Sequence, residues 1–296
     1  MDKYVILHIE GGVGKNIIAT AVVRAINKFY TDRKIIILTA YPEIWELNKR
    51  VWRIYQFGQT QYFYKDFIED KDSIILSHDP YRENDAIYRK RHLSEIWCQM
   101  YNIPFDGEKP ELYFTQLEGD FVQQLLNKTK PIFLINPFGG SPNQKNKYSW
   151  ARDIPPALSQ EIVNEAQKDY RVIQVRREDQ MALNNCEYLS LSTRELAVSL
   201  LYSDKRLLID SFLQHAAAAL NLKSTVLWVG NSPNVFGYEL HDNITSEFEE
   251  ASLKNSLYDP YDIMGNPIQL ATPPNFLFDK DQILTSLGLK NNNFII

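Results

Sequence analysis

Apolar and polar positions alternate in blocks along the first part of the chain. The apolar run KYVILHI is followed by the glycine-rich loop EGGVGK, and apolar residues at helical spacing then continue to Ile26. Further apolar runs cover 33–40 and 73–77. Continuous runs of this length are typical of strands buried on both faces of a parallel sheet. The first part of the chain is therefore predicted to be an α/β unit.

Two helices are expected before the middle of the chain. The first covers 86–101, and its basic triplet 89–91 is interpreted as a solvated face, with binding of an acceptor as the alternative. A proline-bearing extended stretch separates it from the second helix, over 117–127.

The strand and glycine-loop pattern begins again after the segment Lys128-Thr129-Lys130-Pro131. This second half predicts strands at 131–136, 170–175, 206–209 and 224–229, and helices at 157–168, 193–202, 214–220 and 279–287. Alternating strands and helices favour doubly wound parallel sheets. We expect two Rossmann-like domains facing across a cleft, over 1–128 and 129–275, followed by a C-terminal helix and tail over 276–296. Residues 258–278 lack periodicity and are interpreted as a strap.

Composition narrows the class of protein. The 296 residues carry a formal net charge of −5, which predicts no general attraction to nucleic acid or anionic membrane. Cys98 and Cys186 lie far apart, so we expect buried thiols in a reducing compartment. The chain shows neither a charged leader nor an apolar run near the roughly 20 residues that span a bilayer. A cytoplasmic protein without an integral membrane segment is expected.

The loop at 10–16 contains glycines and a lysine, which suits binding of a phosphate at a helix N-terminus. A P-loop ATPase would require Ser or Thr after the lysine to bind Mg²⁺, but Asn16 follows Lys15 here. Glu10 also stands where a deviant P-loop carries a second lysine. The ATPase hypothesis is therefore the weakest one retained.

Two segments of the second half carry groups suited to a diphosphate. Asp210 and Ser211 end a predicted strand directly before an alanine-rich helix that contains His215. They could line an anion site, or simply cap the helix over a buried histidine.

The loop that opens the second half offers a glycine turn, Ser141 and the lysines 145 and 147. These groups suit a diphosphate, although a solvated loop is the plain alternative. Glu178, after another strand, could accept hydrogen bonds from ribose hydroxyls or face water.

The segments GGVGKNIIATAVVRAI, INPFGGSPNQKNKYSWARDIPPALSQEIV and LSTRELAVSLLYSDKRLLIDSFLQHAAAALNLKSTVLWVG occur in this order. Together, over most of residues 1–245, they resemble the heptosyltransferase family, glycosyltransferase family 9. The resemblance implies a GT-B fold and an inverting, metal-independent transfer of a hexosyl or heptosyl group from a nucleotide-diphospho-sugar to a glycan or other hydroxyl-bearing acceptor. It implies no cofactor or metal site, an acceptor held by the N-terminal domain and a donor held by the C-terminal one.

The resemblance also implies site residues. Asp210, Ser211 and His215 match the family segment D-[ST]-x-x-x-H at the diphosphate-sugar site. The expected donor-binding residues are Gly12, Gly14, Ser141, Lys145 or Lys147, Glu178, Asp210, Ser211 and His215.

One position departs from the family pattern. The family loop runs G-G-x-G-D, and its aspartate is the proposed base, but Lys15 stands there in this chain. A protonated lysine cannot accept a proton, so Lys15 is expected to neutralise a diphosphate or a phosphorylated acceptor. Glu10, slightly preferred, and Asp79 are the candidate replacement carboxylates; a Glu10–Lys15 salt bridge without catalytic role is equally compatible. The alternative function is that of a non-catalytic GT-B relative that binds a nucleotide or glycan.

Overall fold

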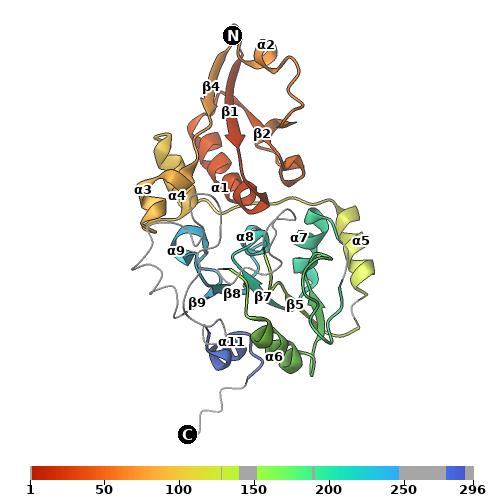
Figure 1. Cartoon of the computed structure of the whole chain (residues 1–296). Coiled ribbons are helices and arrows are strands. Elements are labelled where there is room, and N and C mark those ends of the chain that lie inside the picture. Colours follow the sequence, from red (N-terminus) through yellow and green to blue (C-terminus); the bar gives the residue numbers. More distant parts are fainter. Residues whose placement is uncertain (1, 128, 140–151, 189–190, 247–277, 291–296) are drawn as a thin grey trace. The chain divides into compact units, whose positions relative to one another are not determined.

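The computed structural model describes residues 2–127, 129–139, 152–188, 191–246 and 278–290 (Figure 1). The chain forms two compact units, Met1–Thr115 and Gln116–Ile296, and each contains its own parallel sheet. Helix α5 (Gln116–Leu126) packs against α7 (Thr193–Tyr202) of the second unit. The division between the compact units therefore precedes α5, whereas the domain boundary expected at residue 128 follows it.

The sheet of the first unit has the strand order β3-β2-β1-β4, with all pairs parallel. Its strands are β1 (Lys3–Ile9), β2 (Lys34–Thr39), β3 (Val51–Gln56) and β4 (Asp72–Leu76). The apolar runs predicted β1, β2 and β4. Strand β3 was not predicted, because it lies at the sheet edge, none of its residues is buried, and it therefore lacks an apolar run.

Helices α1 (Val13–Phe29) and α4 (Leu93–Met100) pack against each other in the first unit. On the sheet itself, Tyr4 and Ile6 of β1 join a cluster with Phe67 of the short helix α2 (Phe63–Phe67). Two 3-10 turns, η1 (Pro42–Trp45) and η2 (Pro80–Arg82), follow β2 and β4.

The single helix expected over 86–101 is wrong. The chain forms α3 (Asn84–Ile87), breaks, and resumes as α4 at Leu93. Arg89 takes a left-handed conformation (φ 55°), and the His92 side chain accepts a hydrogen bond from the backbone N–H of Ser94. The basic triplet thus lies in the break and not on a helix face, because His92 acts as an N-cap that starts a new helix.

The sheet of the second unit has the order β6-β5-β7-β8-β9, again with parallel pairs. Its strands are β5 (Ile132–Ile135), β6 (Arg171–Gln174), β7 (Lys205–Ile209), β8 (Thr225–Trp228) and β9 (Asp242–Thr245). The first four were predicted within one or two residues. Strand β9 was missed, because Ile244 is its one buried residue.

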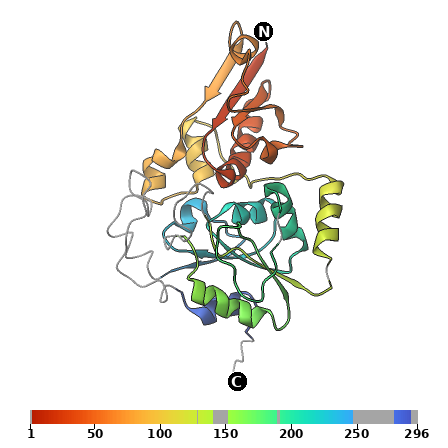
Figure 2. The ribbon, with the colours of Figure 1, turned by 45° about the vertical axis from the view of Figure 1, so that its right-hand side comes forward.

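Helices cover both faces of this second sheet (Figure 2). Phe133 and Ile135 pack with residues of α6 (Pro156–Ala166) and α11 (Lys280–Ser286). Ile132 and Leu134, which alternate with them, face α5 and α7. This alternation explains why every residue of β5 is buried and why the strand reads as an unbroken apolar run.

The structure describes both cysteines and the helices. Cys98 is a buried free thiol, as expected, whereas Cys186 is a half-buried one; burial raises their pKa to about 12 and about 11. Within the described ranges, the helices are too short or too polar to cross a bilayer.

Candidate functional site

Strand order points to one ligand-binding position in each unit. In doubly wound sheets, ligands bind beyond the carboxyl ends of the strands, where the order of the strands reverses. This switch point lies between β1 and β4 in the first unit and between β5 and β7 in the second. Lys15 and Asp79 follow β1 and β4, and Ser211 follows β7. The predicted residues therefore fall at both switch points.

In the loop after β1, Gly11 is the position that requires glycine. Its φ is +99°, and a Cβ built on it would lie 2.9 Å from Cδ of Lys15. Gly12 is the N-cap of α1, with φ −83° and no atom within 4 Å of an added Cβ, and Gly14 lies within the helix. Glycine is thus needed at position 11, both for the left-handed backbone and for the passage of the lysine stem.

Lys15 is buried, with 4% of its side chain exposed. Its Nζ lies 2.9 Å from Oδ1 of Asp79, and 4.8 and 5.4 Å from the ring centres of Tyr81 and Trp97. The alternative Glu10–Lys15 salt bridge is wrong: Glu10 is exposed and forms no ion pair with Lys15 in the described structure. Lys15 is therefore buried and ion-paired with Asp79, an arrangement that gives no support to a role as the base.

Asp79 is accessible, with 36% of its side chain exposed. Oδ1 receives both the Lys15 ammonium and the backbone N–H of Tyr81, at 3.0 Å, which makes Asp79 the N-cap of η2. Among the described residues, none donates a hydrogen bond to Oδ2. One oxygen is therefore fixed by the protein while the other remains available.

Asn16 explains why the first loop is not a P-loop. Its amide is buried: Nδ2 donates to the Gly12 carbonyl (3.0 Å), while Oδ1 accepts from Oγ1 of Thr39 (2.6 Å) and Nε1 of Trp45 (3.0 Å). Neither Asn16 nor the paired Lys15 is placed to hold a triphosphate and its Mg²⁺. The ATPase hypothesis has no support in this geometry.

At the second switch point, Ser211 is the N-cap residue of α8 (Phe212–Ala219), but its side chain makes no capping hydrogen bond. Instead, its hydroxyl donates to Oδ1 of Asn136 at 2.7 Å, and Nδ2 of Asn136 donates to the Phe138 carbonyl at 3.1 Å. The exits of β5 and β7 are thereby linked. Ser211 therefore does not cap the first N–H groups of α8 within the described structure, an arrangement that suits an anion.

A third strand exit extends this polar row. Nδ2 of Asn231, after β8, donates a hydrogen bond to Oδ2 of Asp210, at the end of β7. Asn136, Ser211, Asp210 and Asn231 therefore form a continuous row across three adjacent strands, which we call the switch-point row. Asn136 and Asn231 were not among the expected site residues; the position of Asn136 directly after an apolar run was the signal that could have found it.

His215 and Glu178 form none of the described hydrogen bonds that join this row. His215 is 4% exposed, and its Nδ1 lies 3.0 Å from the hydroxyl of Tyr238, in agreement with the buried-histidine alternative. Glu178 is exposed on the loop after β6. In that loop it is Gln180, which was not predicted, that donates to the Gly139 carbonyl at 2.9 Å. The expected residues Ser141, Lys145 and Lys147 lie outside the described residues.

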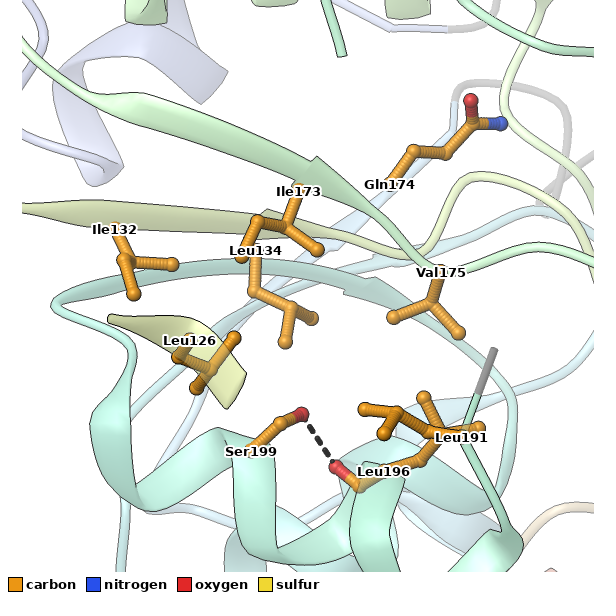
Figure 3. A pocket seen from close by; sticks show the side chains of 9 residues that line it. All are labelled: Leu126, Ile132, Leu134, Ile173, Gln174, Val175, Leu191, Leu196 and Ser199. Carbon is orange, nitrogen blue, oxygen red and sulfur yellow. Dashed lines mark hydrogen bonds between the residues drawn. The ribbon is translucent and has the colours of Figure 1, made fainter. Parts of the chain in front are cut away.

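The second unit also contains a small apolar cavity beneath its sheet (Figure 3). Its volume of about 10 Å³ is near the minimum that holds one water molecule. The hydroxyl of Ser199 is turned to the Leu196 carbonyl, at 2.7 Å. The cavity is lined by Leu126, Ile132, Leu134, Ile173, Gln174, Val175, Leu191, Leu196 and Ser199. This is a packing defect and not a nucleotide site.

Metal-ligating side chains do not gather in the described part of the chain: no group of three or more His, Cys, Asp or Glu residues there could hold an ion.

Two parallel α/β sheets of this kind place the chain in the GT-B fold class of glycosyltransferases. Solved structures that it resembles include those of a family 9 glycosyltransferase and of heptosyltransferases. This confirms the fold class and the family resemblance predicted from the sequence, while the cleft between the domains stays a prediction. Neither protein-family profiles nor the sequences of curated proteins match the chain.

Three solved structures illustrate the likeness. A family 9 glycosyl transferase from Veillonella parvula has a TM-score of 0.69 and 10% identity, over 96% of this chain and 95% of that one. For the E. coli ADP-heptose lps heptosyltransferase II, the TM-score is 0.65 and the sequence identity 13%, over 96% of this chain and 97% of that one. For E. coli heptosyltransferase WaaC, solved with ADP, the TM-score is 0.56 and the sequence identity 11%, over 83% of this chain and 94% of that one. At these identities the likeness is one of fold.

Proposed function

We propose that this protein is a glycosyltransferase that moves a sugar from a nucleotide-diphospho-sugar to an acceptor hydroxyl. The observation that carries the proposal is the Ser211–Asn136 hydrogen bond, which engages the Ser211 hydroxyl so that it does not cap α8 at the switch point of the second sheet. Heptosyltransferases share this fold over most of the chain, and one of them, WaaC, was solved with ADP. A nucleoside diphosphate is the anion that fits such a helix terminus.

The second unit supplies the donor site in this proposal. The N–H groups of α8 hold the diphosphate, the hydroxyl of Ser211 fixes the start of α8 through its hydrogen bond to Asn136, and Asp210, fixed by Asn231, faces the sugar. Ser141, Lys145 or Lys147, and Glu178 complete the site, with a lysine ammonium balancing the diphosphate charge and Glu178 accepting from the ribose. The role expected for His215 is indirect, because its ring is buried against Tyr238.

The first unit supplies the acceptor side. Lys15 and Asp79 lie at its switch point, and Gly12 and Gly14, at the start of α1, present backbone N–H groups to the donor diphosphate in this proposal. The acceptor oxygen attacks the anomeric carbon directly, the bond to the diphosphate breaks with its electron pair leaving on the phosphate oxygen, and the configuration inverts. We propose that this displacement needs no metal ion or cofactor.

Turnover of nucleotide sugars tests the proposal. The full chain is incubated with a panel that includes ADP-, GDP- and UDP-sugars, beginning with ADP-heptose, with and without EDTA. We expect saturable binding and hydrolysis of at least one donor, at rates that EDTA does not change. Indifference to every nucleotide sugar would overturn the proposal, and loss of turnover with EDTA would overturn its metal-independent form.

Non-catalytic binding of a nucleotide is the second candidate function. The observation that favours it is Lys15, a paired cation at the position where the resemblance places the base. Saturable binding of a nucleotide sugar without hydrolysis or transfer to any acceptor would support this candidate over the enzyme.

A further inference from the structure

The Lys15–Asp79 pair is built more rigidly than a surface ion pair. Burying an ammonium group costs folding free energy unless a carboxylate pairs with it. Among the described residues, Asp79 supplies that carboxylate, within 4.0 Å of the Lys15 Nζ. The lysine is held between the rings of Tyr81 and Trp97, and its stem passes over Gly11. The position of its Nζ is therefore set by several independent contacts.

This arrangement orients Asp79 while leaving one oxygen free. Oδ1 is occupied by the Lys15 ammonium and the Tyr81 N–H, and Oδ2 receives no hydrogen bond from the described residues. The carboxylate is 36% exposed and lies between the exits of β1 and β4, at the first switch point. It is a preorganised proton acceptor at the place where a ligand of this unit would bind.

We infer that Asp79 is the base that takes the proton of the acceptor hydroxyl, and that Lys15 is the positioning residue that holds it. This inference rests on the proposed glycosyl transfer. The hydroxyl proton moves to Oδ2 of Asp79 as the acceptor oxygen bonds to the anomeric carbon and the diphosphate leaves with the electron pair. The protonated Asp79 then returns its proton to water.

A carboxylate is a weak base, but a weak base is sufficient for this reaction. The acceptor oxygen becomes strongly acidic once it begins to bond to the anomeric carbon, so a carboxylate suffices when proton transfer accompanies bond formation. Lys15 holds the Asp79 carboxylate in one orientation. The competing carboxylate, Glu10, is exposed and has no such orienting contact to Lys15.

The test compares pairs of variants that differ by one carboxylate. Because Asp79→Asn alone would leave a buried cation unpaired, both variants carry Lys15→Met: K15M and K15M/D79N. The readout is hydrolysis of the nucleotide sugar that the wild-type chain hydrolyses fastest, with water as the acceptor. The matched control is K28M/E108Q, which neutralises another pair of the first unit, with Lys28 Nζ 2.5 Å from Glu108 Oε1.

We expect K15M/D79N to lower kcat by about 10²- to 10⁴-fold relative to K15M, with the donor KM within about threefold. K15M alone lowers kcat by about tenfold without raising KM, and Lys15→Arg recovers most of that loss, as a positioning role requires. Formate restores part of the rate to K15M/D79A, because it replaces the missing carboxylate. The control pair K28M/E108Q retains wild-type kcat.

Equal rates for K15M and K15M/D79N would overturn the inference, as would loss of turnover in Glu10→Gln. If circular dichroism shows that the double variant fails to fold, Asp79→Glu replaces it in the test. Glutamate keeps the negative charge but moves the carboxylate oxygens by one methylene. An unchanged kcat in this variant would overturn the role of Asp79 as the base. A wild-type chain that turns over no nucleotide sugar overturns the proposed function and this inference with it.

Discussion

The hydroxyl of Ser211 donates its hydrogen bond to Oδ1 of Asn136, 2.7 Å away, although Ser211 occupies the N-cap position of α8. The serine that normally caps a helix is thus used to join two strand exits. Ser192 shows the ordinary arrangement in the same unit: it accepts from the Glu195 N–H, and the Glu195 side chain accepts from the Ser192 N–H. Substitutions of the two serines can therefore distinguish the contribution of a helix cap to stability from the contribution of a helix terminus to anion binding.

Ser211→Ala and Ser192→Ala should therefore have different effects. We expect Ser211→Ala to weaken the binding of ADP, used as the probe, by about five- to tenfold, because the α8 terminus loses the order that the Ser211–Asn136 hydrogen bond gives it. Ser192→Ala should leave ADP affinity unchanged and lower the free energy of unfolding by about 1 kcal/mol, since it removes a capping box. Titration calorimetry and urea denaturation measure the two effects. Equal losses of ADP affinity would contradict the assignment of the anion site to α8.

The adjacent glycines 11 and 12 should differ sharply in their tolerance of alanine. Gly11→Ala places a Cβ 2.9 Å from Lys15 Cδ at a φ of +99°, so we expect a loss of about 1–3 kcal/mol in the free energy of unfolding. Gly12→Ala meets no atom within 4 Å and has a negative φ, so its cost should stay below about 1 kcal/mol. Urea denaturation of both variants gives the comparison, and equal stabilities would show that Gly11 is not constrained.

Asn16 is expected to contribute to stability and not to phosphate binding. Asn16→Ala removes the partner of the Thr39 hydroxyl and the Trp45 indole N–H, which are buried, so the free energy of unfolding should fall by about 2–4 kcal/mol. The exposed Asn164→Ala, in α6, is the control and should change it by less than about 0.5 kcal/mol. If Asn16→Ala is as stable as the wild type but no longer binds nucleotide, the expectation is contradicted and the loop at 10–16 is a phosphate-binding loop.

His92 should make the fold sensitive to acid. Burial lowers the pKa of His92 from 6.5 to about 4, so between these values the unfolded chain binds a proton that the folded protein does not. Stability is complete above pH 6.5 and falls as the pH is lowered toward 4, by at most about 3 kcal/mol from this group. His241, whose pKa burial also lowers, adds a loss in the same direction.

His92→Asn separates the two histidines, because asparagine can cap α4 without titrating. Urea denaturation at pH 5 and pH 7 should show a smaller pH dependence in this variant than in the wild type, with the remainder due in part to His241. An unchanged difference between the two pH values would rule out His92 as a source of the acid sensitivity.

Local sequence patterns determined much of the fold. The apolar runs of β1, β2 and β5 predicted buried parallel strands, because a strand covered on both faces needs apolar residues at every position. The helix predicted over 193–202 has those bounds in the structure, since Ser192 and Glu195 form a capping box. Where burial is one-sided, as in the edge strands β3 and β9, the pattern was too weak to predict a strand.

The sequence by itself also determined the candidate segments for the site: the loop after β1, the exit of β4 and the exit of β7. Only the tertiary structure decided how they combine. Lys15 pairs with Asp79 and not with Glu10, and Ser211 with Asn136, because β1 lies beside β4 and β5 beside β7 in their sheets. Strand order arises from the packing of whole layers, which no local pattern encodes, and it is strand order that brings residues distant in the sequence within hydrogen-bonding distance.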